Sequence, residues 1–187
     1  VSLIASGAKA LGWLRSVAAT AKKTLPRGKV KLLAPIPRPR KNVFCVGWNY
    51  VEHFEESRIS RLHTVEFPAH PTFFSKVPTT VIGPYEPVPP HAEVTRQLDW
   101  EVELGVVIGK GGSTIQEADA LKHVFGYTVV NDISAREVQR RHGGQLFKGK
   151  SLDGTCPMGP WIVTADEVPD PHALRLISRV NGVNKQD

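Results

Sequence analysis

Cysteine is scarce in this chain, which has only Cys45 and Cys156 among its 187 residues. The two lie far apart and form no Cys-x-x-Cys pair, which argues against a disulfide framework and a zinc ribbon. We expect both to be buried thiols in a reducing compartment. Long apolar runs are missing as well, since no stretch approaches the roughly 18 residues that suggest a membrane-spanning helix. The sequence therefore does not indicate a membrane protein.

Acidic residues are absent from the first 51 positions, which hold ten Lys and Arg residues. The other positions hold all 18 Asp and Glu residues and the remaining 14 of the 24 Lys and Arg residues. The net charge of +6 thus belongs to the N-terminal segment, and the rest of the chain is mildly acidic. Because the basic residues of that part are scattered among acids, without interleaved aromatic residues, we expect no nucleic-acid binding.

The basic segment, residues 1–41, predicts an amphipathic helix followed by a proline-rich connector. Its apolar residues recur at roughly helical spacing. We interpret it as an extension that lies on the domain, with an organelle transit peptide as the alternative, because it is rich in Ser and Ala and free of acids. Residues 42–187 then form one domain. The helical spacing is carried by Leu3, Ile4, Leu11, Leu14 and Val17.

Short apolar stretches after residue 41 predict strands joined by turns. Two segments predict helices that begin with capping boxes, made by Thr114 with Glu117 and by Ser134 with Glu137. The Gly- and Pro-rich segment 147–160 predicts a loop. The helices are expected at 114–124 and 134–142, and the strands at 42–47, near Phe73, at 98–109, at 125–132, from 161 onwards and at 174–182.

The stretch LDWEVELGVVIG, residues 98–109, joins alternating acids to an apolar run. On a strand, Glu101 and Glu103 would share one face about 6–7 Å apart. Two carboxylates so close raise each other's pKa unless a cation lies between them. Mg²⁺ or Mn²⁺, which prefer carboxylate oxygens, would satisfy both. The alternative is an edge strand with a solvated acidic face.

Asp132 is a third acid that could join this pair. It ends the apolar stretch YTVVND and comes just before a predicted helix. Residues at the ends of strands commonly line functional sites. The alternative role for Asp132 is that of a helix N-cap, for which Ser134 competes. The residues alone leave both readings open.

Four segments, taken in order, resemble the fumarylacetoacetate hydrolase family: NVFCVGWNYVEHFEE, LDWEVELGVVIGK, VVNDISAREVQ and FKGKSLDGTCPMGPW. The resemblance implies a mainly β (α+β) fold, a mixed β-sandwich roll with short peripheral helices. It also implies a divalent cofactor, Mg²⁺ or Mn²⁺, with Ca²⁺ as a further option. Position by position, it implies the metal ligands Glu101, Glu103 and Asp132, the catalytic residues His53, Glu56 and Lys150, and the substrate-binding residues Lys76, Arg136 and Gln139.

This resemblance implies a metal-dependent hydrolase that cleaves a carbon–carbon bond in acylpyruvate- or fumaryl-oxo-acid-type substrates. His53 would act as general base on a water, oriented by Glu56 three residues on. The alternative for His53 is a surface histidine in the acid-rich stretch EHFEE. In an isomerase or decarboxylase of oxo-dicarboxylic acids, the second function considered, the pair would shuttle a proton instead.

A catalytically incomplete binding protein is the alternative from a different class. It is considered because the family's domain continues past the position of Asp187. The expected partners are a small oxo-acid substrate and a second copy of the chain in a homodimer, with neither nucleic acid nor membrane. The expected location is the cytoplasm, and the basic N-terminus leaves a mitochondrial location open.

Overall fold

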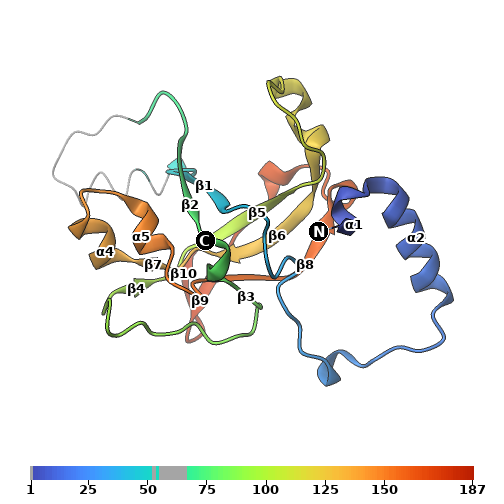
Figure 1. Cartoon of the computed structure of the whole chain (residues 1–187), viewed down its shortest axis with the longest axis horizontal. Helices are drawn as coiled ribbons and strands as arrows, with labels where there is room; N and C mark the ends of the chain where they lie inside the picture. Colours follow the sequence, from blue (N-terminus) through green and yellow to red (C-terminus); the bar gives the residue numbers. More distant parts are fainter. Residues whose placement is uncertain (1, 52–53, 55–66) are drawn as a thin grey trace.

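A four-stranded mixed sheet forms the centre of the protein (Figure 1). The computed structural model describes residues 2–51, 54 and 67–187. The strand order is β3-β8-β6-β5, in which β6 runs antiparallel to β5 and β8, and β3 runs parallel to β8. The strands are β3 (Val81–Ile82), β5 (Val102–Ile108), β6 (Val124–Asn131) and β8 (Cys156–Thr164).

Three two-stranded antiparallel pairs surround this sheet. They are β1 (Val43–Gly47) with β2 (Thr72–Lys76), β4 (Leu98–Asp99) with β7 (Ser134–Ala135), and β9 (Ser178–Val180) with β10 (Val183–Gln186). Strands thus dominate, around a curled mixed sheet with few and short helices. This confirms the predicted fold class.

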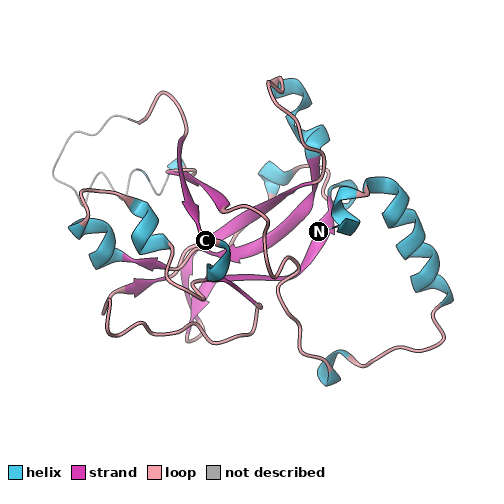
Figure 2. Cartoon of the chain, viewed as in Figure 1, coloured by secondary structure: helices cyan, strands magenta, loops and turns pink. Residues whose placement is uncertain are grey.

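The helices lie at the two ends of the strands, with α4 and α5 at one end and α2 at the other (Figure 2). The α-helices are α1 (Ser2–Ala5), α2 (Gly7–Thr20), α4 (Arg136–Arg141) and α5 (Leu146–Lys150). The 3₁₀ turns are η1 (Arg27–Lys29), η2 (Pro78–Thr80), η3 (Glu117–His123), η4 (Ala165–Glu167) and η5 (Pro171–Ala173).

The buried core brings the connector together with the central sheet. Ala34, from the proline-rich connector, packs with residues of β3, β6 and β8, and Ile36 and Val43 pack against this cluster. Full burial of an aliphatic side chain such as Val130 contributes about 1.5–3 kcal/mol to folding. Part of the predicted 1–41 segment therefore contributes to the core. The cluster consists of Ala34, Val81, Val130, Cys156 and Met158.

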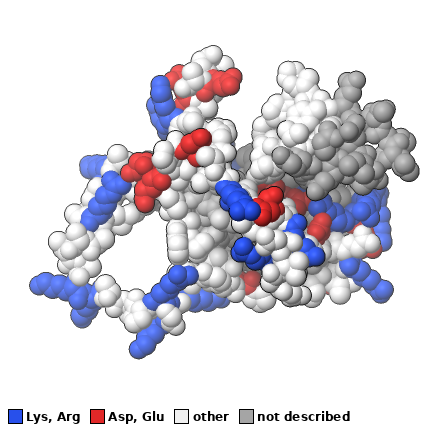
Figure 3. Space-filling view, turned by 180° about the vertical axis from the view of Figure 1, so that it is seen from behind, with Lys and Arg blue, Asp and Glu red and all other residues white. Residues whose placement is uncertain are grey.

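The predicted N-terminal helix forms as α2, and none of its residues is buried. Arg15 in α2 makes an ion pair with Asp166, with 2.9 Å between Arg15 Nη2 and Asp166 Oδ2. Figure 3 shows Lys and Arg side chains along the helix and connector, in keeping with the acid-free sequence. Among the described residues, no helix is long and apolar enough to cross a membrane.

The predicted strand at 98–109 is interrupted at Trp100 and Glu101. The reason is a change of partner: β4 pairs with β7, whereas β5 pairs with β6. Glu101 therefore lies in the break between two strands. The sequence predicted one continuous strand face of alternating acids, and this prediction is wrong.

The two predicted capping boxes are also wrong. Thr114 lies outside η3 with a φ of 52°, and the segment from Glu117 forms 3₁₀ turns instead of an α-helix. Ser134 belongs to strand β7, so the helix that follows begins two residues later. Glu137 instead accepts a hydrogen bond of 2.9 Å from Thr95 Oγ1. Local capping signals were overridden here by pairing with distant segments.

The predicted loop at 147–160 contains the helix α5 and the first half of β8. Two prolines suggested irregular structure, but both fit the strand. Pro157 is paired with Ile82 of β3, and Pro160 lies where the β6–β8 register shifts. Proline is tolerated at the register shift beside Pro160 because no ladder hydrogen bond from its nitrogen is required there.

Candidate active site

The candidate site lies where β5 begins and β6 ends, at one edge of the central sheet. Backbone pairing fixes its two acids: the N–H of Asp132 donates to the carbonyl oxygen of Glu101 at 2.8 Å. The Asn131 side chain accepts a hydrogen bond from the N–H of Glu101 at 3.1 Å. The interruption of the strand at Glu101 thus turns this residue toward the end of β6. Glu101 and Asp132 are both buried, with 8% and 3% exposure.

Lys150, on α5, joins the two acids. Its Nζ lies 2.6 Å from Glu101 Oε2 and 2.7 Å from Asp132 Oδ2. Only 3% of Lys150 is exposed, so water screens these interactions little. A buried lysine is retained only when carboxylates neutralise it, and here two of them do so.

Lys76, at the end of β2, approaches the same aspartate from the other side. Its Nζ lies 2.9 Å from Asp132 Oδ1 and donates to the carbonyl oxygen of Ile133 at 3.0 Å. Lys76 is completely buried. Within the described part of the chain, no hydrogen bond of good geometry reaches Asp132 Oδ1, so its contact with Lys76 is an ion pair. Each oxygen of Asp132 therefore faces its own lysine.

Arg136, the first residue of α4, is the third cation. Its Nη2 lies 2.6 Å from Glu101 Oε1 and 2.7 Å from Asp99 Oδ2. Its Nη1 donates to Gln139 Oε1 at 3.4 Å, a long hydrogen bond. The three cations Lys76, Lys150 and Arg136 thus match the charges of three acids, Asp99, Glu101 and Asp132. We call these six residues the ion-pair cluster.

Ser134, which the sequence analysis considered only as a cap, is a buried member of this site. Its hydroxyl lies 3.2 Å from Glu101 Oε1 and 3.0 Å from the carbonyl oxygen of Asp132. The side chain is completely buried. No local sequence signal predicts this contact, because it arises when β7 pairs with β4 and places Ser134 opposite Asp99.

The ion pairs and burial shift the two glutamates in opposite directions. Burial raises the pKa of Glu101, but the charge and hydrogen bond of Lys150, followed by those of Arg136, outweigh it and leave this pKa below its ordinary value. Burial, then the charges of Glu101 and Asp132, raise the pKa of Glu103 to about 7. Tyr50 makes a side-chain hydrogen bond to Glu103, which opposes that rise. Glu103 is thus the one glutamate of the predicted ligand set without full neutralisation.

The three predicted metal ligands have suitable donor chemistry. Carboxylate oxygens suit a hard divalent cation. Burial is the main cause of the raised pKa of Glu103, and such a cation would relieve the further repulsion from Glu101 and Asp132. In the present arrangement the cation between Glu101 and Asp132 is the Lys150 ammonium. Over the described part of the chain, no three His, Cys, Asp or Glu side chains converge as a metal site. The ligand assignment therefore stays a prediction.

Both thiols lie near the ion-pair cluster, and neither forms a disulfide. Cys156 is fully buried and Cys45 is partly buried. Burial, reinforced by the charge of Asp132, raises the pKa of Cys45 to about 12. Burial likewise raises the pKa of Cys156 to about 11. Thiols with such raised pKa values are protonated near neutral pH, which argues against a role as nucleophiles.

The remaining predicted residues divide into two groups. Gln139 lies in the site, 8% exposed, beside Arg136. The predicted catalytic pair, His53 and Glu56, lies outside the described residues. The structure thus brings Lys76, Glu101, Asp132, Arg136, Gln139 and Lys150 together, with Glu103 at their border.

Close packing of α4 against α5 holds Lys150 and Gln139 near each other. Gly149 makes this packing feasible, because a Cβ atom there would lie 2.5 Å from Gln139 Cγ and 2.9 Å from the carbonyl oxygen of Ala135. No real side chain fits at such distances. The residue next to the buried lysine therefore has to be glycine.

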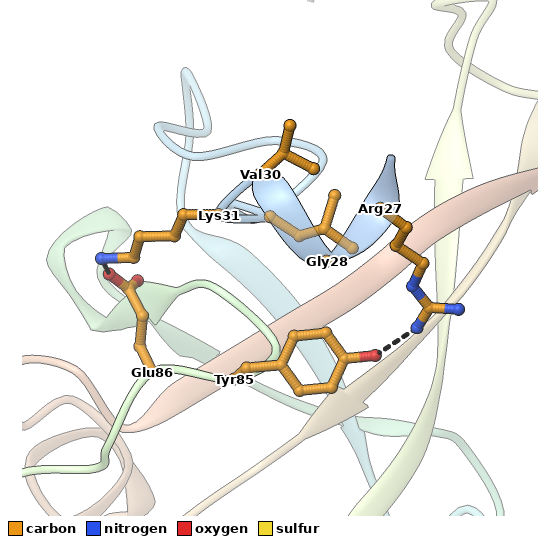
Figure 4. A pocket seen from close by; sticks show the side chains of 7 residues that line it. Arg27, Gly28, Val30, Lys31, Tyr85 and Glu86 are labelled. Atoms are coloured by element: carbon orange, nitrogen blue, oxygen red, sulfur yellow. Dashed lines mark hydrogen bonds and ion pairs between the residues drawn. The ribbon is translucent and has the colours of Figure 1, made fainter. Parts of the chain in front are cut away.

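A cavity of about 460 Å³ lies away from the ion-pair cluster, between the connector and the segment after β3 (Figure 4). Arg27 donates to the Tyr85 hydroxyl at 2.9 Å, and Lys31 Nζ lies 2.6 Å from Glu86 Oε1. Both basic side chains of this cavity already have partners. None of the predicted site residues lines it, so the cluster at the end of β6 remains the candidate active site.

Two curated relatives match nearly the whole chain. "Oxaloacetate tautomerase YisK" of Bacillus subtilis is 46% identical over 194 residues, which cover 100% of this chain and 63% of that protein. "Oxaloacetate tautomerase FAHD2A, mitochondrial" of Homo sapiens is 46% identical over 179 residues, which cover 94% of this chain and 54% of that protein. The chain thus spans little more than half the length of these relatives.

Two solved structures share the fold. Fumarylacetoacetate hydrolase from Exiguobacterium antarcticum superposes with a TM-score of 0.72 at 43% identity, covering 86% of this chain and 55% of that one. A 2-hydroxyhepta-2,4-diene-1,7-dioate isomerase from Mycobacterium marinum superposes with a TM-score of 0.70 at 36% identity, covering 89% and 57%. The family model described as "Fumarylacetoacetate (FAA) hydrolase C-terminal" matches residues 42–187. On this match, and on the relatives' identity along its length, the chain belongs to the fumarylacetoacetate hydrolase family.

Proposed function

We propose that the protein is an isomerase that interconverts the keto and enol forms of a 2-oxo-dicarboxylic acid of the oxaloacetate type. The observation that carries the proposal is the buried ion-pair cluster, found in a chain whose 46%-identical relatives are named oxaloacetate tautomerases. The sequence analysis placed carbon–carbon bond hydrolysis first and isomerisation second. The names of the relatives, and of the solved isomerase, support the second.

Tautomerisation makes modest chemical demands. One proton leaves the carbon next to the keto group, one proton arrives at the keto oxygen, and no other bond breaks. The site has to stabilise negative charge on that oxygen while the proton moves. A buried cluster that holds the N–H donors of three cations in fixed positions suits this demand, because preorganised donors need not reorient as the charge develops.

The donor chemistry of the same site suits a divalent metal, which would take the place between Glu101 and Asp132 that the Lys150 ammonium holds in this structure. We propose that Glu101, Glu103 and Asp132 hold Mg²⁺ or Mn²⁺, with Ca²⁺ as a further option. When bound, the metal would supply Lewis-acid stabilisation of negative charge on the substrate oxygen. Ser134 would then orient Glu101 through its hydrogen bond of 3.2 Å.

The side chains around the three acids would divide the remaining work. Lys150 can donate a hydrogen bond to the substrate oxygen from within the site, since its Nζ already bridges two carboxylates there. Lys76 is fully buried behind Asp132 and would hold that carboxylate ionised. Arg136 and Gln139 would bind a carboxylate of the substrate. We propose that His53, oriented by Glu56, carries the proton.

The decisive experiment compares three reactions of the purified full-length protein with Mg²⁺ or Mn²⁺. Tautomerisation is followed by the loss of enol absorbance after oxaloacetate is added, against a blank with metal alone. Carbon–carbon hydrolysis is followed by pyruvate release from acylpyruvates, and decarboxylation by CO₂ release. The proposal expects fast tautomerisation and slow hydrolysis. Pyruvate release from an acylpyruvate that outpaces tautomerisation would instead restore the hydrolase reading.

We also propose that two copies of the protein associate as a homodimer. The proposal rests on the family assignment, and light scattering coupled to size-exclusion chromatography tests it directly. A mass of one chain at micromolar concentration would contradict it.

A further inference from the structure

Asp99, to which the family resemblance assigns no role, has both carboxylate oxygens engaged within the chain. Its Oδ1 accepts the backbone N–H of Trp100 at 3.0 Å. Its Oδ2 accepts Arg136 Nε at 2.8 Å and lies 2.7 Å from Arg136 Nη2. The pairing of β4 with β7 sets this contact, because it places Asp99 opposite Ser134, two residues before Arg136. Asp99 therefore acts on the site through the guanidinium group.

The guanidinium of Arg136 is held by three different partners. Nε and Nη2 face Asp99, Nη2 also faces Glu101, and Nη1 faces Gln139. A planar guanidinium has its five N–H groups in a fixed fork, so orienting one edge orients the other. By fixing the Nε edge, Asp99 directs Nη1 toward the amide of Gln139.

The contact of 3.4 Å with Nη1 favours one orientation of the Gln139 amide. A guanidinium only donates, so the amide oxygen Oε1 turns toward it and the NH₂ group turns away. The side chain is 8% exposed, and Nε2 has no hydrogen-bond partner among the residues that the structure describes. A buried donor without an acceptor is unfavourable, because nothing replaces the hydrogen bond that it would make to water. An acceptor oxygen from a ligand would remove this cost.

We propose that Asp99 is a positioning residue that, through Arg136, fixes the Gln139 amide with its NH₂ group as the free donor for a carboxylate oxygen of the substrate. The proposal deepens the proposed function and rests on it for the identity of the substrate. Asp99 would then influence substrate affinity, because it makes the Gln139 amide present its NH₂ donor, and not its acceptor oxygen, to the substrate.

The test uses Asp99→Asn, its charge-retaining counterpart Asp99→Glu, and Asp166→Asn as a control that removes only an exposed ion pair. Asparagine keeps the shape of Asp99 but loses the charge that pins Arg136. We expect Asp99→Asn to raise the KM for oxaloacetate about tenfold with kcat within about threefold, as loss of one charge-assisted contact would. Calorimetric Kd for malonate, a simple dicarboxylate, should weaken by a similar factor.

Asp99→Glu should have a KM for oxaloacetate and a Kd for malonate close to those of the wild type. Asp166→Asn should match the wild type in both. Thermal midpoints show whether each variant is folded before these comparisons are made. Unchanged KM and malonate Kd in folded Asp99→Asn would overturn the proposal, as would a fall in kcat alone. If oxaloacetate is not converted but Asp99→Asn still weakens malonate binding, the proposed function fails while the positioning role stands.

Discussion

Lys150 Nζ lies 2.6 Å from Glu101 Oε2, and both side chains are almost completely buried. The same ammonium neutralises Asp132 at 2.7 Å. Removing the lysine therefore leaves two buried carboxylates with less positive charge to neutralise them. The first prediction follows from this arrangement.

Lys150→Met should lower the free energy of unfolding by about 3 kcal/mol at neutral pH, because breaking a buried ion pair strands its partner. It should also abolish measurable turnover. Urea denaturation and the tautomerisation assay measure the two effects. Lys148→Met, an exposed lysine on the same helix, is the matched control and should change neither. Equal stability of the two variants would show that Lys150 does not neutralise the acids.

The raised pKa of Glu103 predicts how stability changes with pH. Burial first, and then Glu101 and Asp132, raise this pKa from 4.5 in the unfolded chain to about 7. The folded protein thus binds the proton more tightly, so the stabilisation is complete below about pH 4.5 and is lost as the pH rises to about 7. Glutamine does not titrate, so the Glu103→Gln variant should not lose this stabilisation as the pH rises.

We expect the free energy of unfolding of Glu103→Gln, relative to the wild type, to rise by about 2 kcal/mol between about pH 5 and about pH 8. Urea titrations with a chelator present measure it on the metal-free protein. Glu117→Gln, an exposed glutamate on η3, should show no such rise. Parallel pH curves for Glu103→Gln and the wild type would contradict the prediction.

Mn²⁺ binding tests the ligand set without reference to turnover. Asp132→Asn should weaken Mn²⁺ affinity at least about tenfold, by analogy with the effects of changing groups near a metal. Electron paramagnetic resonance of free Mn²⁺ measures the affinity. Asp119→Asn, which alters a half-exposed aspartate paired with Lys122, should bind as the wild type does. Identical affinity in Asp132→Asn and wild type would remove Asp132 from the ligand set.

The buried position of Ala34 predicts that the folded unit begins before residue 42. Ala34→Leu should overpack the core cluster and cost about 1–3 kcal/mol of stability. Ala18→Leu makes the same change on the exposed surface of α2 and should be nearly neutral. Thermal unfolding compares the two. A neutral Ala34→Leu would support the boundary at residue 42 that the sequence analysis set.

Sequence reasoning succeeded where chemistry is local to a short stretch. The acids after Leu98 and the acid that ends YTVVND were recognisable, and the family resemblance added Lys76 and Lys150, which the structure places beside them. It failed where two distant segments pair. The break at Glu101 and the burial of Ser134 both depend on the pairing of β4 with β7. This pairing places Asp99 opposite Ser134, which lies 35 residues later in the chain.

The helix α5 was missed for a different reason. Its sequence, LFKGK, carries a glycine that lowers helix propensity. The structure accepts this cost because Gly149 lets α5 approach α4 closely. Propensity therefore gave the wrong prediction at a position where packing selects the residue.

The absence of a side chain at residue 149 has a mechanical consequence. An added Cβ would lie 2.5 Å from Gln139 Cγ and 2.9 Å from the carbonyl oxygen of Ala135, so α5 lies directly against α4 at this residue. A displacement of α5 that withdraws the ammonium of Lys150 would therefore also change the packing around Gln139. The proposed hydrogen-bond donor to the substrate oxygen and the proposed contact to its carboxylate would then change position together.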